Sequence, residues 1–144
     1  MAIYTLKGIH GRSYIPPIAT GTIFNDITVN HWAAAWVEQL AKVGITAGCG
    51  NGNYCPDQVA TTRAQMAVFL LRARYGAGYI PPAVNGSTGF SDVPADYWAA
   101  AWIKQFAAEG ITSGCGGGNY CPDGTLTRAE MAVFLQRTFH LPLP

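Results

Sequence analysis

Apolar residues recur in two stretches of the chain at the three- and four-residue spacing of one face of an α-helix. The first stretch contains Trp32, Trp36, Leu40 and Val43, and the second contains Met66, Phe69, Leu70 and Ala73. The first pattern returns 66 residues later as Trp98, Trp102 and Phe106. Repetition at such a period predicts tandem units, each a helix, a loop and a second helix, and therefore a mainly α fold.

The ends of the second helices are marked by capping residues. Thr62 is followed three positions later by Gln65, and Thr127 by Glu130, which is the pattern of a capping box. Gly76 is placed to end the helix after Thr62.

The first helices carry weaker boundary signals. Asn30 and Asp96 occupy the expected N-cap positions, and Gly44 and Gly110 are placed to end these helices in the left-handed conformation. We therefore expect four main helices and an N-terminal helical segment.

The repeat also extends backwards to the first residue. Met1-Ala-Ile-Tyr aligns with the segment Met66-Ala-Val-Phe, so the chain begins in the middle of a repeat. We expect residues 1–17 to be the end of a truncated repeat with its linker, and residues 18–82 and 83–144 to be the first and second units. The linkers Tyr14-Ile-Pro-Pro and Tyr79-Ile-Pro-Pro are predicted to be extended. We interpret the chain as the C-terminal region of a longer exported protein.

The composition argues against two classes of partner. Only 12% of the 144 residues are charged, the net charge is +1 and no basic run occurs, so the chain lacks the positive surface that nucleic acids require. No apolar stretch approaches the ~20 residues of a membrane-spanning helix.

Four cysteines form two pairs at identical spacing, Cys49 with Cys55 and Cys115 with Cys121. The even, symmetric count favours two disulfides, which would indicate an extracellular location. A four-thiolate zinc site is the alternative, but five residues separate each pair where zinc ligands are usually two to four residues apart. Each surrounding loop is also poor in carboxylates for calcium, so neither a metal nor another cofactor is expected.

The motif that contains these features is specific. Phe90-x-Asp-Val, Trp98-Ala, Gly110-Ile-Thr, the Pro-Asp after Cys121 and Thr127-Arg-Ala-Glu-Met-Ala resemble the S-layer homology repeat of bacterial surface proteins. In that family the units pack as a pseudo-threefold bundle whose inter-repeat grooves bind cell-wall polysaccharide. The resemblance implies a non-catalytic, extracellular module that anchors a protein to envelope polysaccharide at the cell surface.

The resemblance also indicates candidate groove residues. Arg63 and Arg128 would bind carboxylate-bearing sugars through the planar guanidinium group, and the alternative is contact with a neighbouring unit. Asp26 and Asp92 would lie near the groove, although a short Asp at such a position more often accepts hydrogen bonds from backbone N–H groups.

Four aromatic residues are further candidates. Trp32 and Trp98 could stack on a sugar ring, but their helical spacing favours packing in the core. Tyr54 and Tyr120 lie in the cysteine loops. These loops either form one wall of a groove or are disulfide-closed turns that join two helices.

Glycosylation motifs occur in the linkers. Asn85-Gly-Ser is a sequon for N-linked sugars, and Thr20, Thr22 and Thr88 are candidates for O-linked sugars in exposed linkers.

No catalytic constellation is evident, since His10, His31 and His140 do not occupy matching repeat positions. The alternative to anchoring is therefore structural: a self-assembling subunit of an extracellular filament or surface layer. In that case the apolar helix of residues 1–10 would dock on another copy of the chain.

Overall fold

The computed structural model describes residues 1–57 and 61–142, and within these ranges the chain forms helices and no β-strand. The helices are α1 (Ala2–His10), α2 (Ala34–Lys42), α3 (Arg63–Tyr75), α4 (Ala100–Ala108) and α5 (Arg128–Phe139). The mainly α fold is confirmed, with the second helix of each unit longer than the first.

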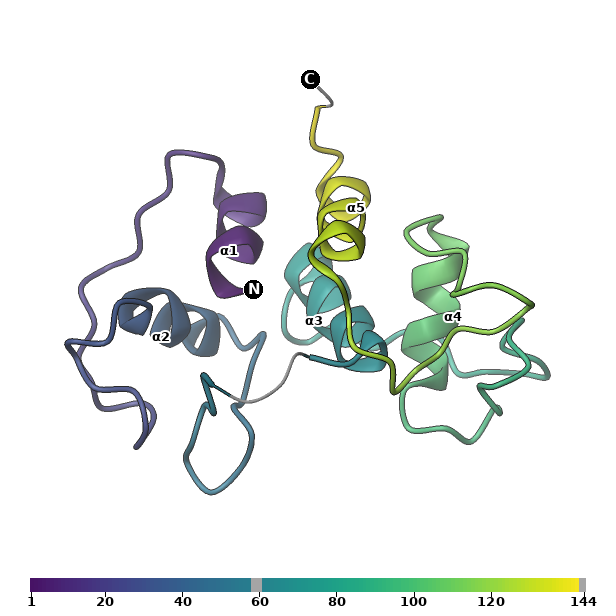
Figure 1. The fold of residues 1–144 in the computed structure, drawn as a ribbon, viewed down its shortest axis with the longest axis horizontal. Coiled ribbons are helices and arrows are strands. Elements are labelled where there is room, and N and C mark those ends of the chain that lie inside the picture. Colours follow the sequence, from purple (N-terminus) through teal and green to yellow (C-terminus); the bar gives the residue numbers. More distant parts are fainter. Residues whose placement is uncertain (58–60, 143–144) are drawn as a thin grey trace.

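The helices are arranged as a central group with two outer helices (Figure 1). The central helices α1, α3 and α5 contact one another, whereas α2 packs on α1 and α4 packs on α3. Each outer helix therefore packs on the central helix of the preceding unit, so neighbouring units interlock.

Both predicted capping boxes are present. The Thr62 and Thr127 hydroxyls accept hydrogen bonds from the N–H groups of Gln65 and Glu130, whose side chains bond back to the Thr N–H groups. Gly76 follows α3 and has a positive φ of 95°. These local signals set the boundaries of α3 and the start of α5.

The predicted N-caps Asn30 and Asp96 are wrong. α2 and α4 begin four residues later, and their N-caps are Ala33 and Ala99, which have no side-chain capping bond. Backbone turns occupy the intervening segment: the His31 N–H donates to the Thr28 carbonyl, and the Ala34 N–H donates to the His31 carbonyl. The Ala33 N–H donates to Nδ1 of the His31 side chain, so this turn takes the place of the predicted Asn30 cap before α2.

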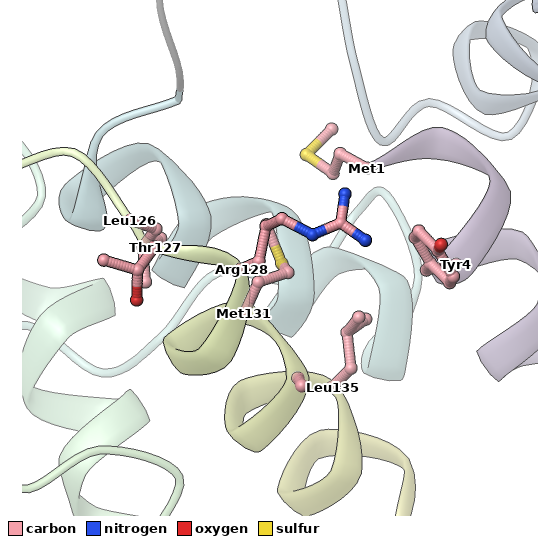
Figure 2. Close-up of a pocket in the computed structure, with 8 residues that line it drawn as sticks. Met1, Tyr4, Leu126, Thr127, Arg128, Met131 and Leu135 are labelled. Atoms are coloured by element: carbon pink, nitrogen blue, oxygen red, sulfur yellow. The ribbon is translucent and has the colours of Figure 1, made fainter.

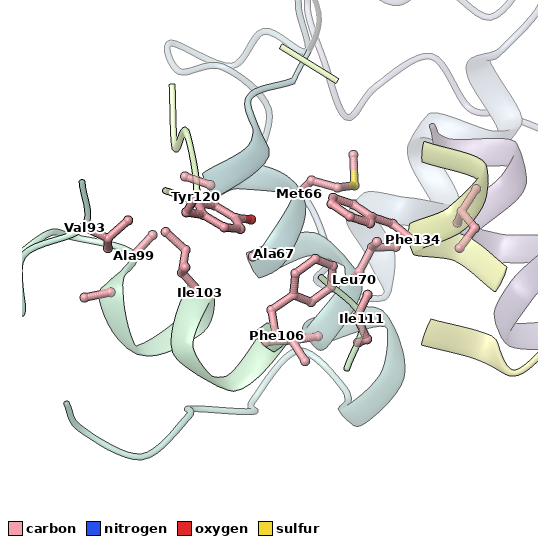
Figure 3. Close-up of a cluster of buried hydrophobic side chains, with 14 residues drawn as sticks. Met66, Ala67, Leu70, Val93, Ala99, Ile103, Phe106, Ile111, Tyr120 and Phe134 are labelled. Carbon is pink, nitrogen blue, oxygen red and sulfur yellow. The ribbon is translucent and has the colours of Figure 1, made fainter. Parts of the chain in front are cut away.

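Two hydrophobic clusters hold the outer helices in place. In the cluster between the two units, Phe106 of α4 lies beside Leu70 of α3 (Figure 3). The rings of Phe106 and Phe134 meet edge to face with centroids 5.0 Å apart.

The first cluster contains the N-terminal helix. Ala2 and Leu6 of α1 are buried against Val37 and Leu40 of α2. Ala2 and Leu6 therefore pack within their own chain, whereas Tyr4 of the same helix is 57% exposed.

Within residues 1–57 and 61–142, no helix is both long enough and apolar enough to span a bilayer.

Candidate functional site

Two disulfide loops, residues 48–57 and 114–123, lie at corresponding places in the two units. The cysteine pairs Cys49–Cys55 and Cys115–Cys121 are bonded, each with a Cα–Cα distance of 6.0 Å, as predicted from their spacing. Asp92 lies close to the second pair, but bonded sulfurs are not thiolate ligands for a metal.

Each disulfide loop is fixed by the aspartate at the entrance of its unit. The Asp26 carboxylate accepts hydrogen bonds from the N–H groups of Tyr54 (2.7 Å) and Cys55 (2.6 Å). These hydrogen bonds lower the pKa of Asp26 below its ordinary value, and the bond from the Tyr54 N–H has the largest effect. Asp92 accepts the equivalent bonds from Tyr120 (2.8 Å) and Cys121 (2.7 Å). The aspartates thus bind backbone N–H groups of the loops.

Arg63 is buried at the junction of the two units, with 3% of its surface exposed. Its Nε donates to the Tyr120 carbonyl at 2.9 Å and a terminal nitrogen donates to the Gly114 carbonyl at 3.2 Å. The other terminal nitrogen forms a 2.6 Å ion pair with Glu130. The guanidinium also lies 5.3 Å from the centre of the Tyr120 ring. Arg63 therefore joins the first unit to the disulfide loop of the second.

Arg128 occupies the matching position in α5, yet it is exposed. The surrounding residues differ in the same way: Val68 is 9% exposed on α3, whereas Val133 is 44% exposed on α5. The cause is the arrangement of the outer helices, since α4 covers α3 and no outer helix of residues 1–57 or 61–142 covers α5. The two repeated arginines thus have different environments.

A pocket of about 370 Å³ lies beside Arg128. Its lining is mostly apolar and comes from the start of α1 and from α5: Met1, Tyr4, Leu126, Thr127, Arg128, Met131, Ala132 and Leu135. Figure 2 shows the Arg128 guanidinium extending toward Met1 and Tyr4. Within the described parts of the chain, no carboxylate forms an ion pair with Arg128. The pocket thus combines an unpaired cation with apolar surface.

The aromatic candidates differ from one another in exposure. Trp32 and Trp98 are 79% and 61% exposed, so the expectation that helical spacing places them in the core is wrong. They precede α2 and α4 in the turns that replaced the predicted first helical turn. Tyr120 is fully buried and its hydroxyl donates to the Arg63 carbonyl at 2.7 Å, whereas Tyr54 is half-buried. Of these four candidates, the two tryptophans present open aromatic surface.

The candidate glycosylation residues also differ from one another in exposure to solvent. Asn85, Thr20 and Thr22 are exposed. Thr88 is buried and its hydroxyl donates to the Val93 carbonyl at 2.6 Å, so the expectation of an exposed linker at this residue is wrong.

Two features of this region gave no sequence signal. The buried Glu38 carboxylate accepts hydrogen bonds from the Thr20 and Gly21 N–H groups, which fixes the linker onto α2. Burial alone would raise the pKa of Glu38, but these bonds outweigh it and lower the pKa. The pocket at Arg128 was also missed, because Met1 and Tyr4 are more than 120 residues from Arg128 in sequence.

Comparisons with known proteins agree with this architecture. The family model of the S-layer homology domain matches residues 89–132. The chain is 28% identical to the S-layer protein EA1 of Bacillus anthracis over 88% of this chain and 14% of that protein. It is 34% identical to a protein named as an uncharacterized cell wall amidase of Bacillus anthracis, over 76% of this chain and 20% of that protein.

A third relative is the cellulosome-anchoring protein of Acetivibrio thermocellus, at 25% identity over 80% of this chain and 25% of that protein. The chain thus spans a quarter or less of the length of these relatives. The matching domain, the repeated motif and the interlocked helices lead to one assignment: this chain belongs to the S-layer homology family.

Proposed function

We propose that the chain is a non-catalytic anchoring module that holds a protein at the cell surface by binding envelope polysaccharide at the Arg128 pocket. The family assignment supports an extracellular, cell-surface location and a role in anchoring. The matched relatives include S-layer and anchoring proteins, and the one named as an amidase shares only a fifth of its length with this chain.

The observation that carries the choice of pocket is the difference between the two repeated arginines. The Arg63 guanidinium makes two hydrogen bonds to carbonyls and one ion pair within the protein. The Arg128 guanidinium is exposed beside apolar surface. A guanidinium group can bind a carboxylate through two parallel hydrogen bonds, and apolar side chains suit the faces of a sugar ring. A carboxylate-bearing saccharide therefore matches this pocket.

The exposed tryptophans suggest secondary contacts. Trp32 and Trp98 hold equivalent positions and present most of their rings to solvent. An aromatic ring can stack on the apolar face of a sugar, so these residues are candidates for additional contacts along a polysaccharide chain.

Binding of purified cell-wall polysaccharide, measured by calorimetry, tests the proposal. We expect Arg128→Met to weaken binding at least tenfold, since a hydrogen-bonded ion pair is worth roughly 1.5–3 kcal/mol. Arg12→Met is the control, because Arg12 is also exposed and its loss changes the net charge equally. Equal affinities of the two variants would exclude the Arg128 pocket as the site.

A further inference from the structure

A second pocket, of about 450 Å³, lies between the first disulfide loop and the start of α3. Gly48 and Tyr54 of the loop and Gln65 and Phe69 of α3 contribute to its lining. Among the described residues, no hydrogen-bond donor is bonded to the Gly48 or Tyr54 carbonyl. The pocket therefore offers main-chain acceptors beside an aromatic side chain.

These four residues correspond one for one to the residues that hold Arg63 in the second unit. Gly48 and Tyr54 are the counterparts, 66 residues earlier, of the two residues whose carbonyls accept from Arg63. Gln65 is the counterpart of Glu130, which forms the ion pair with Arg63.

The last correspondence is aromatic. Phe69 is the counterpart of Phe134, whose ring centre lies 5.4 Å from the Arg63 guanidinium carbon. The same set of groups thus surrounds a guanidinium in the second unit and lines a pocket in the first.

The groups that line the pocket differ in two ways from those around Arg63: no arginine lies among them, and a neutral amide replaces one carboxylate. No arginine or lysine is among the residues that line the pocket, and the N-terminal amine of Met1, whose pKa burial lowers, is the one cationic group that the lining residues carry. The position that matches Arg63 falls three places before Met1 in the repeat register. Gln65 replaces the carboxylate of Glu130, and its single amide oxygen already accepts the capping-box bond from the Thr62 N–H. Recognition therefore rests on the two main-chain carbonyls and aromatic surface.

We propose that this pocket binds the guanidinium group of an arginine. That arginine is not one of residues 1–57 or 61–142 of the same copy of the chain. The two carbonyls and the Phe69 ring of the pocket suit a planar fork with several N–H donors better than the compact ammonium of lysine. The arginine has two sources with the same chemistry: a residue that precedes Met1 in a longer chain, or Arg128 of a second copy, which is exposed.

The first test uses N-acetyl-L-arginine methylamide as the probe, titrated into the full chain and followed by NMR of the backbone amides. We expect saturable shifts at residues 48–55 and at Gln65, and binding about tenfold weaker for the matched lysine compound. Shifts that do not saturate, or that are equal for both probes, would overturn the proposal.

Substitutions at Gln65 sharpen the test because this side chain is exposed and can be changed without disturbing the core. Gln65→Glu restores the carboxylate found at Glu130 and keeps an acceptor for the capping box, so it should tighten probe binding about tenfold. Gln65→Lys should abolish binding through like-charge repulsion. An affinity unchanged by both substitutions would contradict the assignment.

Two further measurements distinguish the sources. If the arginine precedes Met1, an N-terminal extension Thr-Arg-Ala-Gln should block probe binding and raise Tm. If it comes from a second copy, sedimentation should show association that Arg128→Gln weakens and that the probe inhibits. Probe binding that persists with the extension and leaves association unchanged would exclude both sources and contradict the proposal.

Discussion

Replacement of Arg63 by methionine should destabilise the fold far more than the same change at Arg128. Methionine retains much of the apolar stem of arginine but has no donors, so the carbonyls of Tyr120 and Gly114 lose the charged donors that they accept from at 2.9 and 3.2 Å. Hydrogen bonds to charged groups contribute roughly 1.5–3 kcal/mol each.

The ion pair between Arg63 and Glu130 contributes less to the free energy of unfolding than its short N–O distance suggests. The Glu130 side chain is 40% exposed, so water solvates the carboxylate when the arginine is absent, and an exposed pair contributes only about 0–1 kcal/mol. We therefore expect Arg63→Met to lower the free energy of unfolding by about 3 kcal/mol. For a chain of this length, that corresponds to a fall in Tm of about 10 °C.

The assay is urea and thermal unfolding followed by circular dichroism. Arg128→Met is the matched control and should change the free energy of unfolding by less than about 0.5 kcal/mol, because Arg128 is exposed and has no ion-pair partner among the described residues. Glu130→Gln retains an acceptor for the capping box and should cost less than about 1 kcal/mol. Equal losses for the two arginine variants, or a larger loss for Glu130→Gln than for Arg63→Met, would refute the reasoning.

Three other changes have defined outcomes. The lowered pKa of Asp26 implies stability that is fully present above the unfolded pKa of about 4 and is lost as the pH falls through the lower folded pKa; Asp26→Asn should flatten this acid dependence in unfolding curves measured from pH 6 to 2. Reduction of the disulfides should cost about 2 kcal/mol for each short loop, and hydrogen exchange should then rise more at Cys49 than at Cys115, whose loop is also bonded to Arg63. Phe106→Ala should cost about 3–5 kcal/mol in thermal unfolding, because the side chain is fully buried; a loss below 1 kcal/mol would contradict its place in the core.

Local signals explain which structural expectations succeeded. The capping boxes at Thr62 and Thr127 require only residues within one helical turn, and the structure contains both. The cysteine pairs are each separated by six positions, so their bonding also depends on short-range geometry.

The failures share a different cause. Trp32 and Trp98 fit the helical period, but the turns before α2 and α4 rotate them into solvent. Periodicity cannot detect a helix that begins a turn later than its apolar pattern. Asn30 and Asp96 failed as caps for the same reason.

The unequal environments of the repeated arginines depend on tertiary structure. Thr62-Arg-Ala and Thr127-Arg-Ala are identical in sequence, and local reasoning assigns both arginines the same role. Arg63 is buried only because the outer helix and disulfide loop of the next unit pack against α3. The number and order of units therefore determine which arginine is exposed, and no window around either residue contains that information.

Each outer helix packs on the central helix of the preceding repeat. This arrangement also affects how arrays of such repeats change in length. Recombination at the Pro-Pro linkers would exchange whole covalent repeats while separating an outer helix such as α4 from its central helix α3. Every joint between neighbouring repeats would then recreate one and the same interface, with an arginine entering the next disulfide loop. A gene could therefore gain or lose a repeat without a new interface having to evolve.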